Sequence, residues 1–380
     1  MQAMKRQSGF TLAEVLIVMG ILAFIIVAAS QTFIGLLANA KTQGKITATN
    51  IEGMLGLDVL RRDLAHAGYG LYWELDPSSR PVTQSYSEVT SNANGQALND
   101  APAGIPRPLV FGGGRGLNGS DWIAVKSVNV SSDSHSELYN YLYTSPVVSV
   151  NVWTPASYNV DPSDYVVVMR PDQSHRYLVF TTAATGNQQS DKMQNVLANY
   201  APDTTSIIFS LGTSTVPRMP FNRADYYIAN TGIPSRCAAG TGVLYKAVVN
   251  QASSSTGYLP AIPLVDCVAD MQVAYRYDST GGNYANTVSD VNAIQPATAD
   301  SARQIREVRV YILAQEGQRD NTYTYPNQTV RVGETNPPNT YTFGRDFNFV
   351  ADGGIADWQH YRWKLYTLIV EPICLLNWGI

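Results

Sequence analysis

The sequence predicts an α+β protein in which one long N-terminal helix is joined to a large antiparallel β-rich head. Three observations support this fold class. Residues 15–38 are all uncharged and mostly apolar, residues 41–66 keep a helical repeat of apolar positions, and short alternating runs separated by turns follow residue 70. The 380 residues are enough for a sizeable hydrophobic core.

The apolar segment has the length and composition of a membrane-spanning helix. Residues 15–38 would form a helix of about 36 Å, and the hydrocarbon core of a bilayer is about 30 Å thick. Glu14 is the only charged residue between Phe10 and Ala40, and Lys5 and Arg6 precede it. Because basic ends stay in the cytoplasm, the residues after the helix are expected in the periplasm. The side chains expected in the membrane include Val15, Leu16, Ile17, Leu22, Phe24 and Ile25.

The start of the chain differs from an ordinary secretory signal peptide. Such a peptide has an apolar region of about 7–15 residues that ends in a small-residue cleavage site. Here the apolar run is longer, and the small residue, Gly9, precedes it. Cleavage after Gly9 would leave the helix in the mature chain, which would begin at Phe10.

The sequence G-F-T-L-A-E at residues 9–14, with basic residues upstream, resembles the class III leader of type IV prepilins and type II secretion pseudopilins. The resemblance implies that a prepilin peptidase cleaves between Gly9 and Phe10 and that Phe10 is N-methylated. It also implies that Glu14 assists docking into a growing filament by pairing with the N-terminal amine of a neighbouring subunit. An inner-membrane assembly platform is a further implied partner.

Glu14 is a candidate functional residue on physical grounds as well. An ionised carboxylate in a membrane helix costs about 2–3 kcal/mol even on lenient insertion scales. An α-amine on an adjacent subunit would offset that cost inside a helix bundle. Alternatively, Glu14 reaches the lipid headgroups, because it lies only four residues from the mature terminus.

Residues 39–67 are expected to continue the helix as an amphipathic segment. Apolar residues recur every three to five positions from Ile46 to Leu64, and charged residues, Asp63 among them, are assigned to the other face. Typical pilins carry a proline 22 residues into the mature chain, where this sequence has Gln31. Gly68 predicts the end of the helix.

Several later segments resemble PilW-type minor pilins. They are L-R-R-D-L-A-H-A-G-Y-G at 60–70, G-S-D-W-I-A-V at 119–125, V-D-C-V-A-D-M-Q-V-A-Y at 265–275 and R-W-K-L-Y-T-L-I-V at 362–370. The resemblance implies a minor pilin that enters a type IV pilus with other minor and major pilins and primes assembly at or near the tip. The protein would cross the inner membrane once as a prepilin and then reach the cell-surface pilus. The alternatives are a J-type pseudopilin of a type II secretion system and a pilus-presented adhesin.

These features predict four parts of the chain: a cleaved leader (1–9), a membrane and filament-core helix (10–38), its amphipathic continuation (39–67) and a periplasmic head (68–380). Within the head, strands are predicted at 122–128, 165–169, 177–181, 206–210, 243–249, 271–277, 308–313 and 363–370. Surface loops are predicted at 77–106, 183–204, 250–258, 278–300 and 315–345. The alternative to a single head domain is a second small subdomain inserted between residues 80 and 260.

Three cysteines lie in the part of the chain predicted to be periplasmic, where disulfides persist. We expect a Cys237–Cys267 bridge, because both lie centrally in the head, whereas Cys374 lies near the end of the chain. Such a bridge would stabilise the domain by about 3 kcal/mol. The alternative is three free thiols.

The sequence predicts no catalytic residue, no metal site and no cofactor. The match to G-x-G-x-x-G at residues 114–119 precedes a strand-like run, whereas a dinucleotide site needs a helix there. The four histidines lack metal-ligand spacing, and the calcium-loop-like segment 278–283 has one carboxylate. A net charge of −4 argues against nucleic-acid binding. The tyrosine clusters at 139–143 and 323–325 are typical both of interfaces and of ordinary strands and turns.

Overall fold

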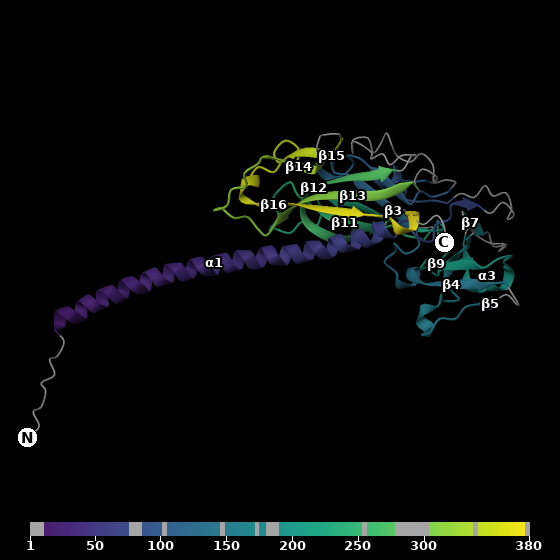
Figure 1. Cartoon of the computed structure of the whole chain (residues 1–380), viewed down its shortest axis with the longest axis horizontal. Helices are drawn as coiled ribbons and strands as arrows, with labels where there is room; N and C mark the ends of the chain where they lie inside the picture. The colour runs from purple at the N-terminus through teal and green to yellow at the C-terminus, as the bar shows by residue number, and fades with distance from the viewer. Residues whose placement is uncertain are drawn as a thin grey trace, which may run out of the picture.

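The computed structural model describes residues 11–75, 86–100, 105–144, 149–171, 175–179, 190–252, 257–277, 304–336 and 341–376. In these residues one long helix leads into a head that contains two seven-stranded sheets and a two-stranded sheet (Figure 1). The predicted α+β fold class is therefore confirmed. Gly9, Phe10 and the calcium-loop-like segment 278–283 lie outside the described residues.

Helix α1 (Leu12–Ala65) has 54 residues, which corresponds to a length of about 80 Å. Figure 1 shows its N-terminal part extending away from the head as a rod, while its C-terminal part lies along the large sheet. Its C-cap is His66, and the chain then turns at Gly68, whose φ of +81° favours glycine. Leu57, Leu60 and Leu64 are buried against the head.

The large sheet has the strand order β16-β13-β12-β11-β10-β3-β2, and each neighbouring pair is antiparallel. The strands are β2 (Leu109–Gly112), β3 (Trp122–Ser127), β10 (Asn222–Ala229), β11 (Gly242–Val248), β12 (Ile262–Tyr277), β13 (Ile305–Glu316) and β16 (Arg362–Val370). Helix α1 packs on β12, β13 and β16. The approach is closest at Gly56, where an added Cβ would lie 1.9 Å from the carbonyl oxygen of Leu264. Only glycine fits at that crossing.

The second sheet has the order β1-β7-β6-β9-β4-β5, with β8 paired to β6. The strands are β1 (Glu74–Leu75), β4 (Tyr139–Tyr143), β5 (Ser149–Val150), β6 (Tyr165–Pro171), β7 (Arg176–Val179), β8 (Asp191–Lys192) and β9 (Ser206–Ser210). It packs on the chain that leaves α1, because Tyr72 is buried in its core and the ring of Tyr69 lies 5.3 Å from that of Phe209. Figure 1 accordingly shows this sheet beyond the C-terminal end of α1. It lies within residues 74–210, largely in the interval where the sequence left a second subdomain as an alternative.

The prediction of a surface loop at 315–345 was wrong. Strands β14 (Thr329–Asn336) and β15 (Tyr341–Asn348) form an antiparallel pair that packs on β12. Val332, Phe343 and Phe347 are fully buried beneath it. Polar residues between these buried positions obscure the apolar alternation in the sequence. The strands are recognised only from their packing against β12.

The eight predicted strands each overlap an observed strand, whereas β2, β4 and β10 and the two-residue strands β1, β5 and β8 were missed, in addition to β14 and β15. The predicted loop 183–204 contains a short helix, α3 (Met193–Asn199), and residues 180–189 lie outside the described part. The other short helices are α2 (Ala93–Gln96), α5 (Ile373–Leu376), η1 (Leu117–Gly119), η2 (Ser134–Glu137), η3 (Ala156–Tyr158) and η5 (Trp358–His360).

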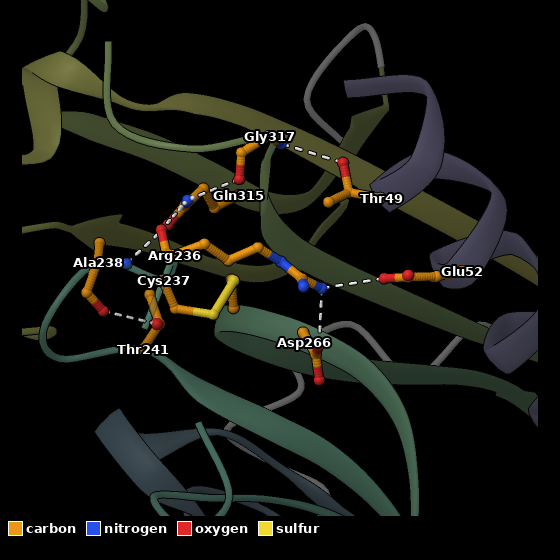
Figure 2. The surroundings of a disulfide bond; sticks show 10 residues. Thr49, Glu52, Arg236, Cys237, Ala238, Thr241, Asp266, Gln315 and Gly317 are labelled. Atoms are coloured by element: carbon orange, nitrogen blue, oxygen red, sulfur yellow. Dashed lines mark hydrogen bonds and ion pairs between the residues drawn. A yellow bond between two sulfur atoms is a disulfide. The ribbon is translucent and has the colours of Figure 1, made fainter. Parts of the chain in front are cut away.

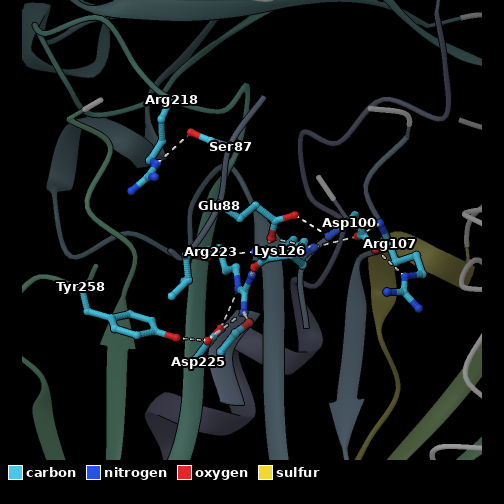
Figure 3. A network of polar contacts seen from close by, with 12 residues as sticks. Ser87, Glu88, Asp100, Arg107, Lys126, Arg218, Arg223, Asp225 and Tyr258 are labelled. Atoms are coloured by element: carbon cyan, nitrogen blue, oxygen red, sulfur yellow. Dashed lines mark hydrogen bonds and ion pairs between the residues drawn. The ribbon is translucent and has the colours of Figure 1, made fainter. Parts of the chain in front are cut away.

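A buried network of charged side chains attaches residues 86–100 to strands β3 and β10 (Figure 3). The ammonium group of Lys126 lies 2.9 Å from Glu88 and 2.7 Å from Asp100, and the guanidinium of Arg223 lies 2.6 Å from Glu88 and 2.7 Å from Asp225. The side chains of Glu88, Lys126, Arg223 and Asp225 are 0% exposed. Burial alone would raise the pKa of Glu88, but Lys126 and Arg223 hold that pKa below its usual value.

Substitution of Arg223 tests whether this network supports the head. We expect Arg223→Met to lower the free energy of unfolding by about 3–5 kcal/mol, because it leaves Glu88 and Asp225 buried with less compensating charge. The measurement is urea unfolding of the detergent-solubilised protein. The matched control is Arg319→Met, whose ion pair with Asp357 is exposed and should contribute about 0–1 kcal/mol. Equal losses in the two variants would contradict the prediction.

Candidate functional site

The first turn of α1 forms a capping box in which Glu14 takes part. The backbone N–H of Thr11 donates to Glu14 Oε2 at 2.9 Å, and the N–H of Glu14 donates to Thr11 Oγ1 at 3.3 Å. This arrangement satisfies donors that would otherwise lack partners at the helix start. Among the described residues Glu14 Oε1 accepts no hydrogen bond, and the side chain is exposed. The carboxylate can therefore accept a further donor, such as an amine.

The apolar half of α1 packs on nothing within the described chain. Residues Leu12–Leu37 have a mean hydropathy of 2.8, and their length and composition suffice to cross a bilayer. The exposed fractions are 48% at Val15, 61% at Leu16, 63% at Ile17, 56% at Leu22, 76% at Phe24 and 56% at Ile25. A contiguous apolar surface of this extent marks a contact with lipid or with other protein.

Polar contacts attach the middle of α1 to the head. Figure 2 shows Arg236 reaching from the loop between β10 and β11 to the helix, where its guanidinium lies 2.9 Å from Glu52 and 2.7 Å from Asp266. The N–H of Gly317 donates to Thr49 Oγ1 at 3.0 Å. These contacts come from two loops of the head that are distant in sequence, so the helix position depends on both loops.

A disulfide between Cys237 and Cys267 lies directly beside Arg236 and Asp266 (Figure 2). It joins the β10–β11 loop to β12, and it is the pair that the sequence analysis favoured. The side chain of Gln315 also holds this loop, because it accepts from Ala238 N at 2.7 Å and donates to Arg236 O at 2.9 Å. Cys374 is free and half-buried in α5.

Asp63 attaches the buried end of α1 to the sheet. Its carboxylate lies 2.5 Å from the ammonium group of Lys246 and accepts a hydrogen bond from the hydroxyl of Tyr226. Burial raises the pKa of Tyr226 well above its usual value, so the phenol stays protonated and donates. The assignment of Asp63 to a solvent-facing side of the helix was wrong, because the head covers it. Its position three residues after Leu60, on the apolar face, was the available signal.

The structure also places the glycine-rich segment and the two tyrosine clusters that the sequence analysis considered. The glycine-rich segment 114–119 ends in the turn η1 and is followed by strand β3, with Gly114 N donating to Asp121. Across the described residues no group of three or more His, Cys, Asp or Glu side chains could hold a metal ion. The tyrosine cluster at 139–143 is strand β4, and Tyr323 lies against the guanidinium of Arg362.

Two family models match the chain. Type IV Pilus-assembly protein W (PilW) matches residues 226–371, a segment that contains β11 to β16 and the disulfide. The prokaryotic N-terminal methylation motif matches residues 4–30. Together they confirm the resemblance to prepilins and PilW-type pilins that the sequence predicted.

Among solved structures, a type IV-like pilin from Thermus thermophilus is similar to the chain, with 13% sequence identity and a TM-score of 0.24. The similarity covers 56% of this chain and 86% of that protein. A comparison with curated proteins finds no match.

Removal of the disulfide tests its contribution to the stability of the head. We expect the double variant Cys237→Ser, Cys267→Ser to lose about 3 kcal/mol of unfolding free energy, because the unfolded chain is no longer closed across 30 residues. Urea unfolding in detergent measures this change. Cys374→Ser is the control and should unfold as the wild type does. A double variant that matched Cys374→Ser would show that the bridge contributes nothing.

Proposed function

We propose that this chain, a type IV pilin-like protein with a PilW domain and a prepilin methylation motif, is a minor pilin that enters a type IV pilus at or near the tip and primes its assembly. Prepilin peptidase removes residues 1–9 by cleaving between Gly9 and Phe10, and Phe10 is N-methylated. The matched families are structural pilus components, and the proposal assigns the chain no catalytic residue and no cofactor.

The apolar half of α1 carries the proposal, because it needs a partner that its own head does not supply. Residues 10–38 lie in the inner membrane before assembly, with Lys5 and Arg6 on the cytoplasmic side and the head in the periplasm. In the filament the same surface packs against the helices of other minor and major pilins. The amphipathic residues 39–67 then connect this core to the head at 68–380.

Glu14 guides the entry of the subunit into the filament. Its Oε1, which accepts no hydrogen bond from the described residues, belongs to an exposed side chain at the start of the apolar helix, so it can accept the N-terminal amine of a neighbouring processed pilin. Inside a helix bundle, where no water solvates the carboxylate, this pair offsets a desolvation cost of about 2–3 kcal/mol. The two subunits come into contact at the inner-membrane assembly platform.

The position of the second sheet supports a place at the tip. Because the helix is anchored in the membrane, later subunits enter on the membrane side of the head. The second sheet lies on the opposite side, beyond the C-terminal end of α1 (Figure 1). In the middle of a filament, the next subunit away from the membrane would have to pack around the second sheet. At the tip there is no such subunit. The PilW match favours a pilus over a secretion pseudopilus.

Two substitutions of Glu14 separate charge pairing from helix capping. We expect Glu14→Ala and Glu14→Gln to be processed and inserted normally but strongly depleted from pili, because neither carries the negative charge that forms an ion pair with an amine. Gln still serves in a capping box. Immunoblots of sheared pili and of membranes measure both steps. Wild-type incorporation of Glu14→Ala would contradict the pairing role, and rescue by Gln would assign the effect to capping.

The location of the protein along native pili tests the tip proposal. We expect gold-labelled antibodies against the head to mark one end of each sheared pilus, and deletion of the chain to reduce piliation and twitching. Labels distributed along the whole length would contradict a tip position. Normal pili together with lost enzyme secretion would instead support the pseudopilus alternative, and normal pili with lost attachment the adhesin.

A further inference from the structure

A cavity of about 350 Å³ opens beside strand β4 of the second sheet. Its lining consists of Glu137, Leu138, Tyr139, Trp153 and Tyr158. Three of these five side chains are aromatic, and the neighbouring Tyr141 extends the same cluster, with its ring 6.1 Å from that of Trp153. Aromatic side chains of this density beside an open cavity are typical of ligand sites rather than of a plain solvent-facing sheet.

The aromatic rings of the cavity are held in a defined arrangement. The rings of Tyr139 and Trp153 lie 5.7 Å apart at 68° to each other. Trp153 Nε1 donates to the carbonyl oxygen of Tyr139 at 2.8 Å. Because the polar atom of the indole is used within the protein, Trp153 offers its apolar faces to a ligand. Tyr158 is 59% exposed and forms another part of the lining.

The loop that carries Trp153 and Tyr158 is fixed by Asn159. The side chain of Asn159 accepts from Trp153 N at 2.7 Å and donates to Trp153 O at 2.9 Å. Asn140, buried in β4, donates to Asn159 Oδ1 at 3.1 Å. The cavity is therefore preformed, and binding of a ligand would cost little conformational entropy in its walls.

The cavity also has polar groups at its rim. Glu137 Oε1 lies 3.4 Å from the guanidinium of Arg62 in α1, whereas Glu137 Oε2 has no partner among the described residues. In the same described residues the phenol oxygens of Tyr139 and Tyr158 form no hydrogen bond. Because Arg62 balances the charge of Glu137, the rim offers hydrogen-bond partners with little net charge.

We propose that this cavity binds a neutral pyranose sugar. A pyranose ring has an apolar C–H face, which matches the faces of Trp153 and Tyr158, and a hydroxyl edge, which matches Glu137 and the phenol groups. The volume lies at the lower end of the range for ligand pockets, about 300–1,000 Å³, and suits one or two sugar rings. The near-neutral rim favours a neutral ligand over a quaternary ammonium ion, which an aromatic cage with a free carboxylate would prefer.

Sugar binding is a property of the second sheet and goes beyond a structural role in the pilus. At the distal side of the head, the cavity would face the surroundings of the cell. The binding does not depend on the position of the protein in the filament, so the two proposals can fail separately.

The test uses the full-length protein in a polyoxyethylene detergent, whose headgroup is not a sugar. The probes are methyl glycosides of glucose, galactose, mannose and N-acetylglucosamine, and saturation-transfer NMR with titration measures binding. We expect saturable binding of at least one glycoside, weakened at least tenfold by Trp153→Ala and by Tyr158→Ala. Tyr143→Ala is the matched control, because Tyr143 is an exposed residue of β4 outside the lining and should leave binding unchanged.

Circular dichroism establishes that each variant is folded, and the exposed Tyr158 keeps the test valid if Trp153→Ala unfolds. The proposal is overturned if the folded wild type binds none of the glycosides, or if Tyr158→Ala binds as tightly as Tyr143→Ala. Binding of tetramethylammonium in place of the sugars would also overturn it and would identify a cation cage.

Discussion

The apolar side chains of Leu12–Leu37 cannot stay in water, and the rest of the molecule depends on this constraint. Each large apolar side chain left exposed forgoes about 1.5–3 kcal/mol of burial, and this half of α1 is not buried by any described residue of the head. The helix must therefore lie in a bilayer or among other helices. A surface that is stable in both settings allows one segment to act as an anchor and then as a filament contact.

The other half of α1 is part of the head core, so the helix is held in a fixed position on the large sheet. Leu57, Leu60 and Leu64 are buried, and Gly56 lets the helix approach β12 closely. Arg236 and Asp63 add ionic contacts at two separate points along the helix. The disulfide holds the loop of Arg236 to β12, the longest strand of the sheet on which the helix lies. The same contacts therefore attach the helix and stabilise the head.

The two sheets of the head differ in their relation to α1. The large sheet supports α1 and overlaps the segment that the PilW family model matches. The second sheet packs its core on the chain that follows the helix, through Tyr69 and Tyr72, and the exposed ion pair of Arg62 with Glu137 links α1 to the turn before β4. Its core does not include the apolar residues of the helix, and strand β4 can carry aromatic side chains that a filament contact would otherwise bury.

The sequence by itself determined what depends on near neighbours: the long helix, its apolar half, Glu14 in the first turn and the eight strands with clear alternation. It favoured the Cys237–Cys267 pair, but only the structure brings these two cysteines together across 30 residues. Only the tertiary structure decided the rest. Arg223 meets Glu88 across 135 residues, Asp63 is covered by Lys246, and β14 and β15 become a buried pair only on β12. Periodicity reports which face of an element is apolar, but which distant group covers a charge depends on the packing of the whole chain.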